Sequence, residues 1–188
     1  QISPFGDVWV ATSSGSGFNN PTKWGSLGFY YSRTVDTLPG ALPMTGDYNG
    51  DGLGDLAQVT PYGDVWVALS TGSGFQDPQR WTSPPTMIIF DPYAGYYPMT
   101  ADMNGDGMDD VVEITPTGEV LVALSQGNSF SQHQNWGMTG FRYSESEDML
   151  VIVGDVNADM NDDLIQITPN GDPWVATSNG SSMNVSSR

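Results

Sequence analysis

The sequence predicts an all-β fold built from a repeated four-stranded antiparallel sheet. Three observations support this prediction. Short runs that alternate valine with polar residues recur along the chain, and no stretch keeps a helical period. Glycine (23 residues) and proline (13 residues) separate these runs. In addition, two motifs return at nearly constant spacing, which is typical of a repeat architecture.

Two motifs define the repeat. A glycine-led motif occurs as GDVWVATSSGSGF at 6–18, GDVWVALSTGSGF at 63–75, GEVLVALSQGNSF at 118–130 and GDPWVATSNGSSM at 171–183. An acidic motif occurs as GDYNGDGLGDLAQVTP at 46–61, ADMNGDGMDDVVEITP at 101–116 and GDVNADMNDDLIQITP at 154–169. The first advances in steps of 57, 55 and 53 residues and the second in steps of 55 and 53, so both motifs belong to one structural unit.

Each unit has the pattern of four short strands. The first strand leads into the acidic motif, the second leaves it, a Pro-x-Gly turn connects to the third, and the fourth runs toward Trp24, Trp81 or Trp136. Four antiparallel strands in a unit of this length form one blade of a β-propeller, and each blade needs neighbours on both faces. We therefore expect one repeat array over 1–188, made of a partial blade at 6–25, blades at 41–82 and 96–137, and a partial blade at 149–178.

The expected strands do not fill a ring. The chain opens at the third strand of a unit, holds two whole units and ends just after a third strand. Propellers generally close with about four to eight blades. Three arrangements would cover the open sides: the remainder of a longer propeller chain, a second copy of the chain in a homo-oligomer, or closure of an unusually small ring. The first two are equally favoured.

The acidic motif has the ligand pattern of a calcium loop. Side-chain oxygens stand at positions 1, 3, 5 and 9, and a glycine at position 6 permits a sharp bend. Such a loop surrounds a hard cation with oxygens, to which the backbone carbonyl at position 7 adds one, whereas magnesium prefers water-rich octahedral sites. The predicted Ca²⁺ ligands are Asp47, Asn49, Asp51, Leu53 and Asp55 in the first loop, Asp102, Asn104, Asp106, Met108 and Asp110 in the second, and Asp155, Asn157, Asp159, Asn161 and Asp163 in the third.

The loops are distinct from an EF-hand, which needs a bidentate glutamate at position 12 and flanking helices. Position 12 holds Gln58, Glu113 or Gln166 within β-patterned segments. Aspartate, asparagine and glycine also cluster in ordinary β-turns, but three copies in register with the repeat favour metal binding. The third loop has Met160 where the others have glycine, so we expect a strained and weaker site unless Asn161 absorbs the turn.

At these residues the sequence resembles a known family. D-x-N-x-D-G-x-x-D loops between the first two strands of a four-stranded unit, followed by G-D-V-W-V-A-L-S-x-G-S-G-F, are similar to the FG-GAP or VCBS repeats of calcium-binding β-propellers. Such repeats occur in integrin α-subunit heads, in secreted bacterial proteins and in fungal lectins similar to the Psathyrella velutina lectin. The resemblance covers nearly the whole chain, and it implies the fold and calcium binding more strongly than any one function.

Aromatic residues supply candidate ligand contacts. The segments 24–32 and 136–144 share the pattern W-G-x-x-G-F-x-Y-S, and aromatic rings beside glycines and polar groups suit a sugar face. The alternative is that these rings only hold adjacent blades apart. The tryptophans of the third strands, Trp9, Trp66 and Trp174, are expected to pack between blades because Leu121 replaces them in one copy. The candidate ligand-binding residues are Trp24, Phe29, Tyr31, Trp81, Trp136, Phe141 and Tyr143.

Composition excludes several function classes. A formal net charge of −17 argues against nucleic-acid binding, and the absence of cysteine excludes disulfides and thiolate chemistry. No apolar run is long enough to cross a membrane, and no catalytic motif surrounds the single histidine, His133, so we expect no enzyme. We expect a secreted lectin-like protein that binds glycans or glycoproteins, because extracellular calcium is concentrated enough to fill modest sites. The alternative is an adhesion module or a non-catalytic appendage of a secreted enzyme.

Overall fold

The computed structural model describes residues 1–3, 5–28, 41–60, 62–82, 96–141 and 150–184. These residues form thirteen β-strands and no helix, so the all-β prediction is confirmed. Accordingly, nothing in this part of the chain is a helix long and apolar enough to span a membrane.

The strands form four antiparallel sheets, which we number in chain order. The first sheet pairs β1 (Asp7–Val10) with β2 (Thr22–Ser26). The second sheet contains β3 (Leu42–Gly46), β4 (Asp55–Val59), β5 (Val65–Ala68) and β6 (Gln79–Arg80). The third sheet contains β7 (Tyr97–Ala101), β8 (Asp110–Ile114), β9 (Glu119–Ala123) and β10 (Gln134–Met138). The fourth sheet contains β11 (Leu150–Gly154), β12 (Asp163–Ile167) and β13 (Pro173–Ala176).

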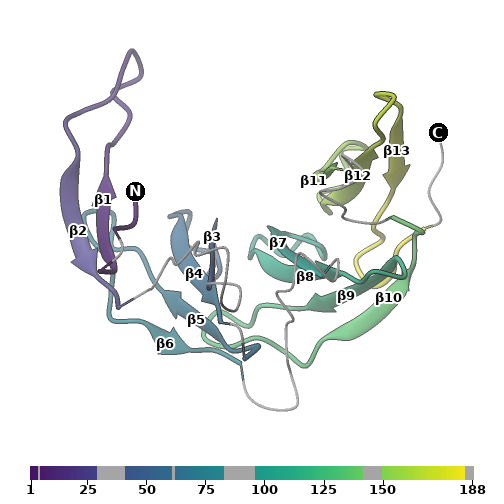
Figure 1. Ribbon diagram of the computed structural model, residues 1–188, viewed down its shortest axis with the longest axis horizontal. Helices are drawn as coiled ribbons and strands as arrows, with labels where there is room; N and C mark the ends of the chain where they lie inside the picture. The colour runs from purple at the N-terminus through teal and green to yellow at the C-terminus, as the bar shows by residue number, and fades with distance from the viewer. Residues whose placement is uncertain (4, 29–40, 61, 83–95, 142–149, 185–188) are drawn as a thin grey trace.

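The sheets are arranged side by side along an open arc (Figure 1). Strands β3, β7 and β11 lie on the inner side of the arc, and β6 and β10 lie on its outer side. Contacts join β3 to β7 and β7 to β11. Each sheet is a meander in which sequential strands pair, as the β-propeller blade predicts, but the arc does not close into a ring.

A short turn with one recurring hydrogen-bond pattern links the second and third strands. In the second sheet the Gly63 amide donates to the Thr60 carbonyl (3.0 Å), and the Asp64 amide donates to Thr60 Oγ1 (3.2 Å). Gly63 has a φ of 83°, a left-handed conformation that glycine adopts without steric cost. The predicted Pro-x-Gly turn therefore has a direct physical basis.

The hydrophobic core lies between adjacent sheets. Val65 and Val67 of β5 face a cluster that also holds Val111 and Ala123 of the third sheet. A second cluster joins the third and fourth sheets, and Trp174 packs partly buried against it, as predicted. By contrast, Trp66 remains 37% exposed and Trp9 41% exposed, because these rings lie on the sheet faces opposite the buried valines. The prediction that all three tryptophans pack between blades is therefore wrong for Trp9 and Trp66.

Candidate functional site

The first acidic loop is folded by its own carboxylates. Asp47 Oδ1 accepts hydrogen bonds from the amides of Gly50 (2.8 Å) and Asp51 (3.1 Å), and Asp47 Oδ2 accepts one from Gly52 (2.6 Å). Asn49 Oδ1 accepts from the Asp51 amide (3.0 Å), and Asp51 Oδ1 accepts from the amide of Leu53 (2.8 Å). The side chains at positions 1, 3 and 5 therefore hold the loop backbone in a tight turn by accepting hydrogen bonds from its amides.

The other two loops repeat this pattern. Asp102 accepts from the amides at positions 4, 5 and 6 of the second loop at 2.8, 3.2 and 2.9 Å, and Asp155 does the same in the third loop at 2.7, 3.3 and 3.0 Å. In each loop the position-5 aspartate accepts a hydrogen bond on Oδ1 from the backbone amide at position 7. The donor is Met108 in the second loop and Asn161 in the third, each at 2.9 Å. The side chains of Asn104 and Asn157 each donate a hydrogen bond from Nδ2 to the position-5 carboxylate of their loop, at 2.9 Å. Asp106 and Asp159 are those position-5 acceptors.

The aspartate at position 9 is buried in all three loops. Asp55, Asp110 and Asp163 are 0% exposed. Each carboxylate accepts one hydrogen bond from a backbone amide at the start of its own loop and one from a backbone amide just after the third strand. For Asp110 the donors are Met103 (3.1 Å) and Ser125 (2.8 Å). Burial raises the pKa of all three carboxyls and raises that of Asp110 to about 7, although the hydrogen bonds act in the opposite direction.

The third loop contains two strained residues. Met160 has a φ of 75°, so Asn161 does not absorb the turn and the expected strain is present. Ala158 has a φ of 64° at position 4, where the other loops have Gly50 and Gly105. Each non-glycine residue in this conformation costs roughly 1–2 kcal/mol. Sequence reasoning missed Ala158, although comparing position 4 across the repeats would have found it.

The donor set suits a hard cation, because it consists only of carboxylate, amide and carbonyl oxygens. Ionised carboxylates offer about four lone-pair sites each, so the hydrogen bonds leave further acceptor capacity on Asp47, Asp102 and Asp155. Within the described segments, however, no group of three or more acidic or histidine side chains stands close enough to hold a metal ion. Calcium binding by these loops therefore remains a prediction.

The loops also join neighbouring sheets. Asp109, at position 8 of the second loop, donates its amide to the Asp47 carbonyl (2.7 Å) and accepts the Asp47 amide on Oδ2 (2.6 Å). Asp162 makes the same pair of bonds to Asp102 at 2.7 and 3.0 Å. These two residues were missed by sequence reasoning, because the contact depends on how successive loops are stacked. Burial raises the pKa of Asp109.

Most of the predicted aromatic ligand residues that can be placed are buried. Trp81, Trp136 and Phe141 are 6%, 4% and 2% exposed within the inter-sheet clusters, so their rings offer no open face to a sugar. This packing favours the alternative role, in which the rings hold the sheets together. Trp24 is only partly buried and packs against Phe75 with ring centroids 5.6 Å apart. Three further candidates lie outside the described residues, namely Phe29, Tyr31 and Tyr143.

A different group of aromatic residues is accessible. Trp66 lies opposite Arg80 in the β5–β6 pair, and Arg80 Nη1 lies 3.5 Å from Asp64 Oδ1. The first sheet repeats this arrangement, because Trp9 lies opposite Lys23 and Lys23 Nζ lies 2.7 Å from Asp7 Oδ1. The third sheet has the equivalent polar pair, in which Asn135 donates to Glu119 (3.0 Å), but it carries leucine in place of tryptophan.

Comparison with known proteins agrees with these observations. The family model for the FG-GAP-like repeat matches residues 47–112. A structure on specific recognition of non-reducing terminal N-acetylglucosamine by an Agrocybe aegerita lectin is similar with a TM-score of 0.68 and 20% identity, covering 97% of this chain and 46% of the lectin chain. The structure of TcdB2–TccC3 without its hypervariable C-terminal region is similar with a TM-score of 0.54 and 20% identity, covering 76% of this chain and 7% of that one.

These matches define the class of protein. The chain has a β-propeller-like fold, and residues 47–112, which include the first two acidic loops, match the FG-GAP-like repeat. It spans about half the length of the lectin chain that it resembles. A search of curated protein sequences finds no match.

Proposed function

We propose that this chain is a non-catalytic, glycan-binding β-propeller that acts outside the cell and is stabilised by calcium. The observation that supports sugar binding is the exposed tryptophan beside an ion pair on the second sheet, repeated on the first. Trp66 is 37% exposed, and the side chains of Arg80 and Asp64 are 45% and 32% exposed. The fold is shared with a lectin that recognises terminal N-acetylglucosamine, which supports a sugar as the ligand class.

The chemistry of this surface matches that of a pyranose ring. A sugar has an apolar face of C–H groups that packs on an indole ring, and hydroxyl groups at its edge. Arg80 donates and Asp64 accepts hydrogen bonds at the edge of Trp66, so the two kinds of contact lie side by side. Because the same arrangement recurs around Trp9, weak single sites would combine through multivalency on a multivalent glycan.

Calcium would stabilise the loops that connect the sheets. The chain has a formal net charge of −17, and the charges of Asp47, Asp102 and Asp155 repel the position-9 carboxylates of their loops and contribute to their raised pKa values. A bound divalent ion supplies the positive charge that lowers this repulsion, while the residues at positions 1, 3, 5, 7 and 9 provide oxygens. Such sites fill at millimolar calcium, which supports a secreted location.

The experiment is a glycan array in calcium with the wild-type chain and the Trp66→Leu variant. Leucine is the residue that the third sheet carries at this position, so the variant should fold normally. We expect binding to glycans with terminal N-acetylglucosamine, weakened up to about tenfold in Trp66→Leu, because aromatic contacts contribute about 0.5–1.5 kcal/mol. The control is Tyr62→Ala, which removes an aromatic ring that is 77% exposed in a turn. Absence of binding to every glycan would contradict the proposal and favour the adhesion or appendage function.

A further inference from the structure

A buried network of hydrogen bonds joins the three acidic loops. Each link uses the aspartate at position 9 of one loop, the serine that follows the third strand of the same sheet, and the residue at position 2 of the preceding loop. From the third loop to the first, the members are Asp163, Ser178, Met103, Asp110, Ser125, Tyr48 and Asp55. Ser125 and Ser178 are 4% and 2% exposed, and the other members are 0% exposed.

The link between the second and first loops passes through Ser125. The Ser125 amide donates to Asp110 Oδ1 (2.8 Å), and Ser125 Oγ donates to the Tyr48 carbonyl (2.6 Å). The Tyr48 amide in turn donates to Asp55 Oδ2 (3.0 Å). One serine therefore holds a carboxylate of its own loop through its backbone and the backbone of the preceding loop through its side chain.

The link between the third and second loops repeats this geometry. The Ser178 amide donates to Asp163 Oδ1 (2.9 Å), and Ser178 Oγ donates to the Met103 carbonyl (2.7 Å). The Met103 amide donates to Asp110 Oδ2 (3.1 Å). Because Asp110 Oδ1 belongs to the first link and Oδ2 to the second, the two links meet at this carboxylate.

Successive loops also approach each other closely at position 4. A Cβ built on Gly50 would lie 3.1 Å from Met108 Cγ of the second loop. A Cβ on Gly105 would lie 3.1 Å from the Met160 carbonyl oxygen of the third loop. Since packed groups leave little free space, a shift of one loop is passed to the loop before it.

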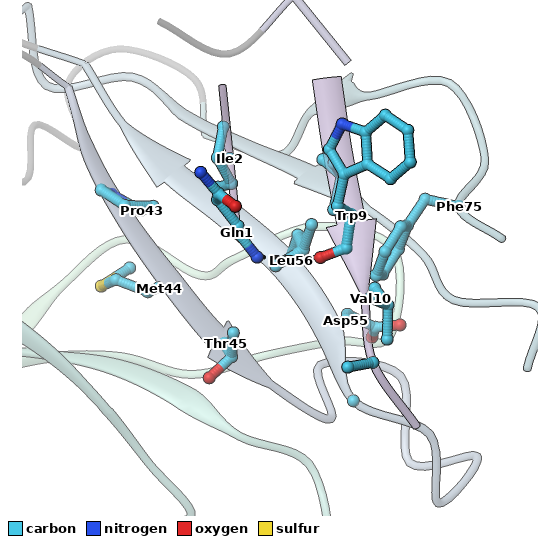
Figure 2. Close-up of a pocket in the computed structure, with 13 residues that line it drawn as sticks. Gln1, Ile2, Trp9, Val10, Pro43, Met44, Thr45, Asp55, Leu56 and Phe75 are labelled. Carbon is cyan, nitrogen blue, oxygen red and sulfur yellow. Dashed lines mark hydrogen bonds between the residues drawn. The ribbon is translucent and has the colours of Figure 1, made fainter. Parts of the chain in front are cut away.

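The first loop has the same serine but ends the network. The Ser70 amide donates to Asp55 Oδ1 (2.7 Å), and Ser70 Oγ accepts from the Gly72 amide (3.2 Å). Figure 2 shows Asp55 and Leu56 in the wall of a pocket of about 640 Å³, which Trp9 also lines. Among the described residues, no acidic loop precedes the first one, so the Ser70 hydroxyl has no loop carbonyl to hold.

We propose that Ser125 and Ser178 couple neighbouring acidic loops, so that the order of one loop, and with it the calcium affinity, depends on the next loop. The calcium part of the inference rests on the proposed function. A loop that is closed around an ion fixes its position-9 carboxylate, which holds the serine amide. The serine hydroxyl then fixes the position-2 residue of the preceding loop. Filling one loop therefore raises the affinity of its neighbour, and linkage makes the effect reciprocal.

The third loop gives the coupling a direction that can be measured. Ala158 and Met160 strain this loop, so its own affinity should be the lowest of the three. The link through Ser178 should raise that affinity when the second loop is filled. Conversely, a third loop that cannot fill should weaken the second.

The test is a calcium titration of the 188-residue chain followed by NMR, with the amides of Gly105 and Gly107 reporting on the second loop. Asp159→Asn weakens the third loop, because it removes a ligand charge but keeps an acceptor for the Asn161 amide. We expect this variant to raise the calcium concentration at half-saturation of the second loop at least about fivefold. In a Ser178→Ala background the same change should leave the second loop unaffected.

Ser70→Ala is the matched control. Ser70 is 6% exposed and accepts the Gly72 amide, as Ser178 accepts the Gly180 amide, but its hydroxyl holds no other loop. In this background Asp159→Asn should still weaken the second loop about fivefold. Equal transmission in Ser178→Ala and Ser70→Ala overturns the proposal, and so does the absence of any effect of Asp159→Asn in the otherwise wild-type chain.

The other link provides an independent cycle if Ser178→Ala fails to fold. Asp106→Asn should weaken calcium binding by the first loop, read at the amides of Gly50 and Gly52, and Ser125→Ala should abolish this effect. Persistence of the effect in Ser125→Ala overturns the proposal.

Hydrogen exchange in chelator separates the coupling from calcium binding itself. Without metal, Ser178→Ala should speed exchange of the Gly105 and Gly107 amides, which donate to Asp102, whereas Ser70→Ala should not. If no loop takes up calcium but this difference is seen, the proposed calcium stabilisation fails and the coupling is supported. Unchanged exchange in Ser178→Ala overturns the coupling, whether or not calcium binds.

Discussion

The second and third acidic loops share one hydrogen-bond pattern but differ in what surrounds them. In both loops the aspartate at position 1 accepts hydrogen bonds from three backbone amides, and the aspartate at position 9 is 0% exposed. The second loop has glycine at its two left-handed positions and stacks on the third, whereas the third has Ala158 and Met160 there and, within the part of the chain that the structure describes, stacks on no further loop. The comparison indicates that the carboxylates set the shape of a loop, and we expect glycine and the next sheet to set its stability.

The largest expected effect concerns pH in the absence of calcium. Burial raises the pKa of Asp110 to about 7, so the folded chain binds a proton that the unfolded chain releases near pH 4. The stability that this proton contributes is complete below about pH 4 and is lost as the pH rises toward 7, and the loss is on the order of 4 kcal/mol. Urea unfolding in chelator should show stability falling across this window.

The Asp110→Asn variant provides the control for this prediction. An asparagine keeps the side-chain carbonyl but does not titrate, so the pH dependence of the chelated protein should flatten. The equivalent Asp163→Asn change should flatten it less, because burial raises the pKa of Asp110 further than that of Asp163. An unchanged slope in Asp110→Asn would contradict the assignment.

The next prediction compares a glycine that packs against a neighbouring sheet with the equivalent glycine that does not. Gly46→Ala places a methyl group 2.5 Å from Thr100 Cγ2 and 2.8 Å from Asp109 Oδ2, which should destabilise the chain by about 1–3 kcal/mol. Gly154→Ala, at the equivalent position of the fourth sheet, meets nothing within 4 Å and should change the stability of the single chain little. Chemical denaturation of the two variants at low protein concentration gives the comparison, and equal losses would contradict it.

The smallest effect sharpens the difference between the loops themselves. Met160→Gly should stabilise the third loop by about 1 kcal/mol by relieving its left-handed conformation, and Gly107→Ala should destabilise the second by a similar amount. A Cβ on Gly107 meets no atom within 4 Å, so this change tests the backbone alone. Thermal melting of both variants checks the prediction, and shifts in the same direction would contradict it.

The repeat made most of the fold predictable. Two motifs in step define strand order within each sheet, and a glycine or its replacement at position 6 indicates where a loop is strained. The docking of Asp109 and Asp162 on the preceding loop was not predictable, because neither spacing nor residue type shows how two loops stack. The aromatic residues illustrate the same limit: Trp66 and Trp136 look alike in sequence, but strand alternation exposes one and an inter-sheet cluster buries the other.

We expect calcium to hold the acidic loops, and a calcium titration of the chelated protein tests this most directly. Isothermal titration calorimetry combined with thermal melting should show at least two bound ions and a rise in melting temperature that magnesium does not reproduce. Each site filled to about 100 times its dissociation constant should add about 2.7 kcal/mol of stability. No heat of binding, together with identical melting curves in calcium and in chelator, would contradict the account.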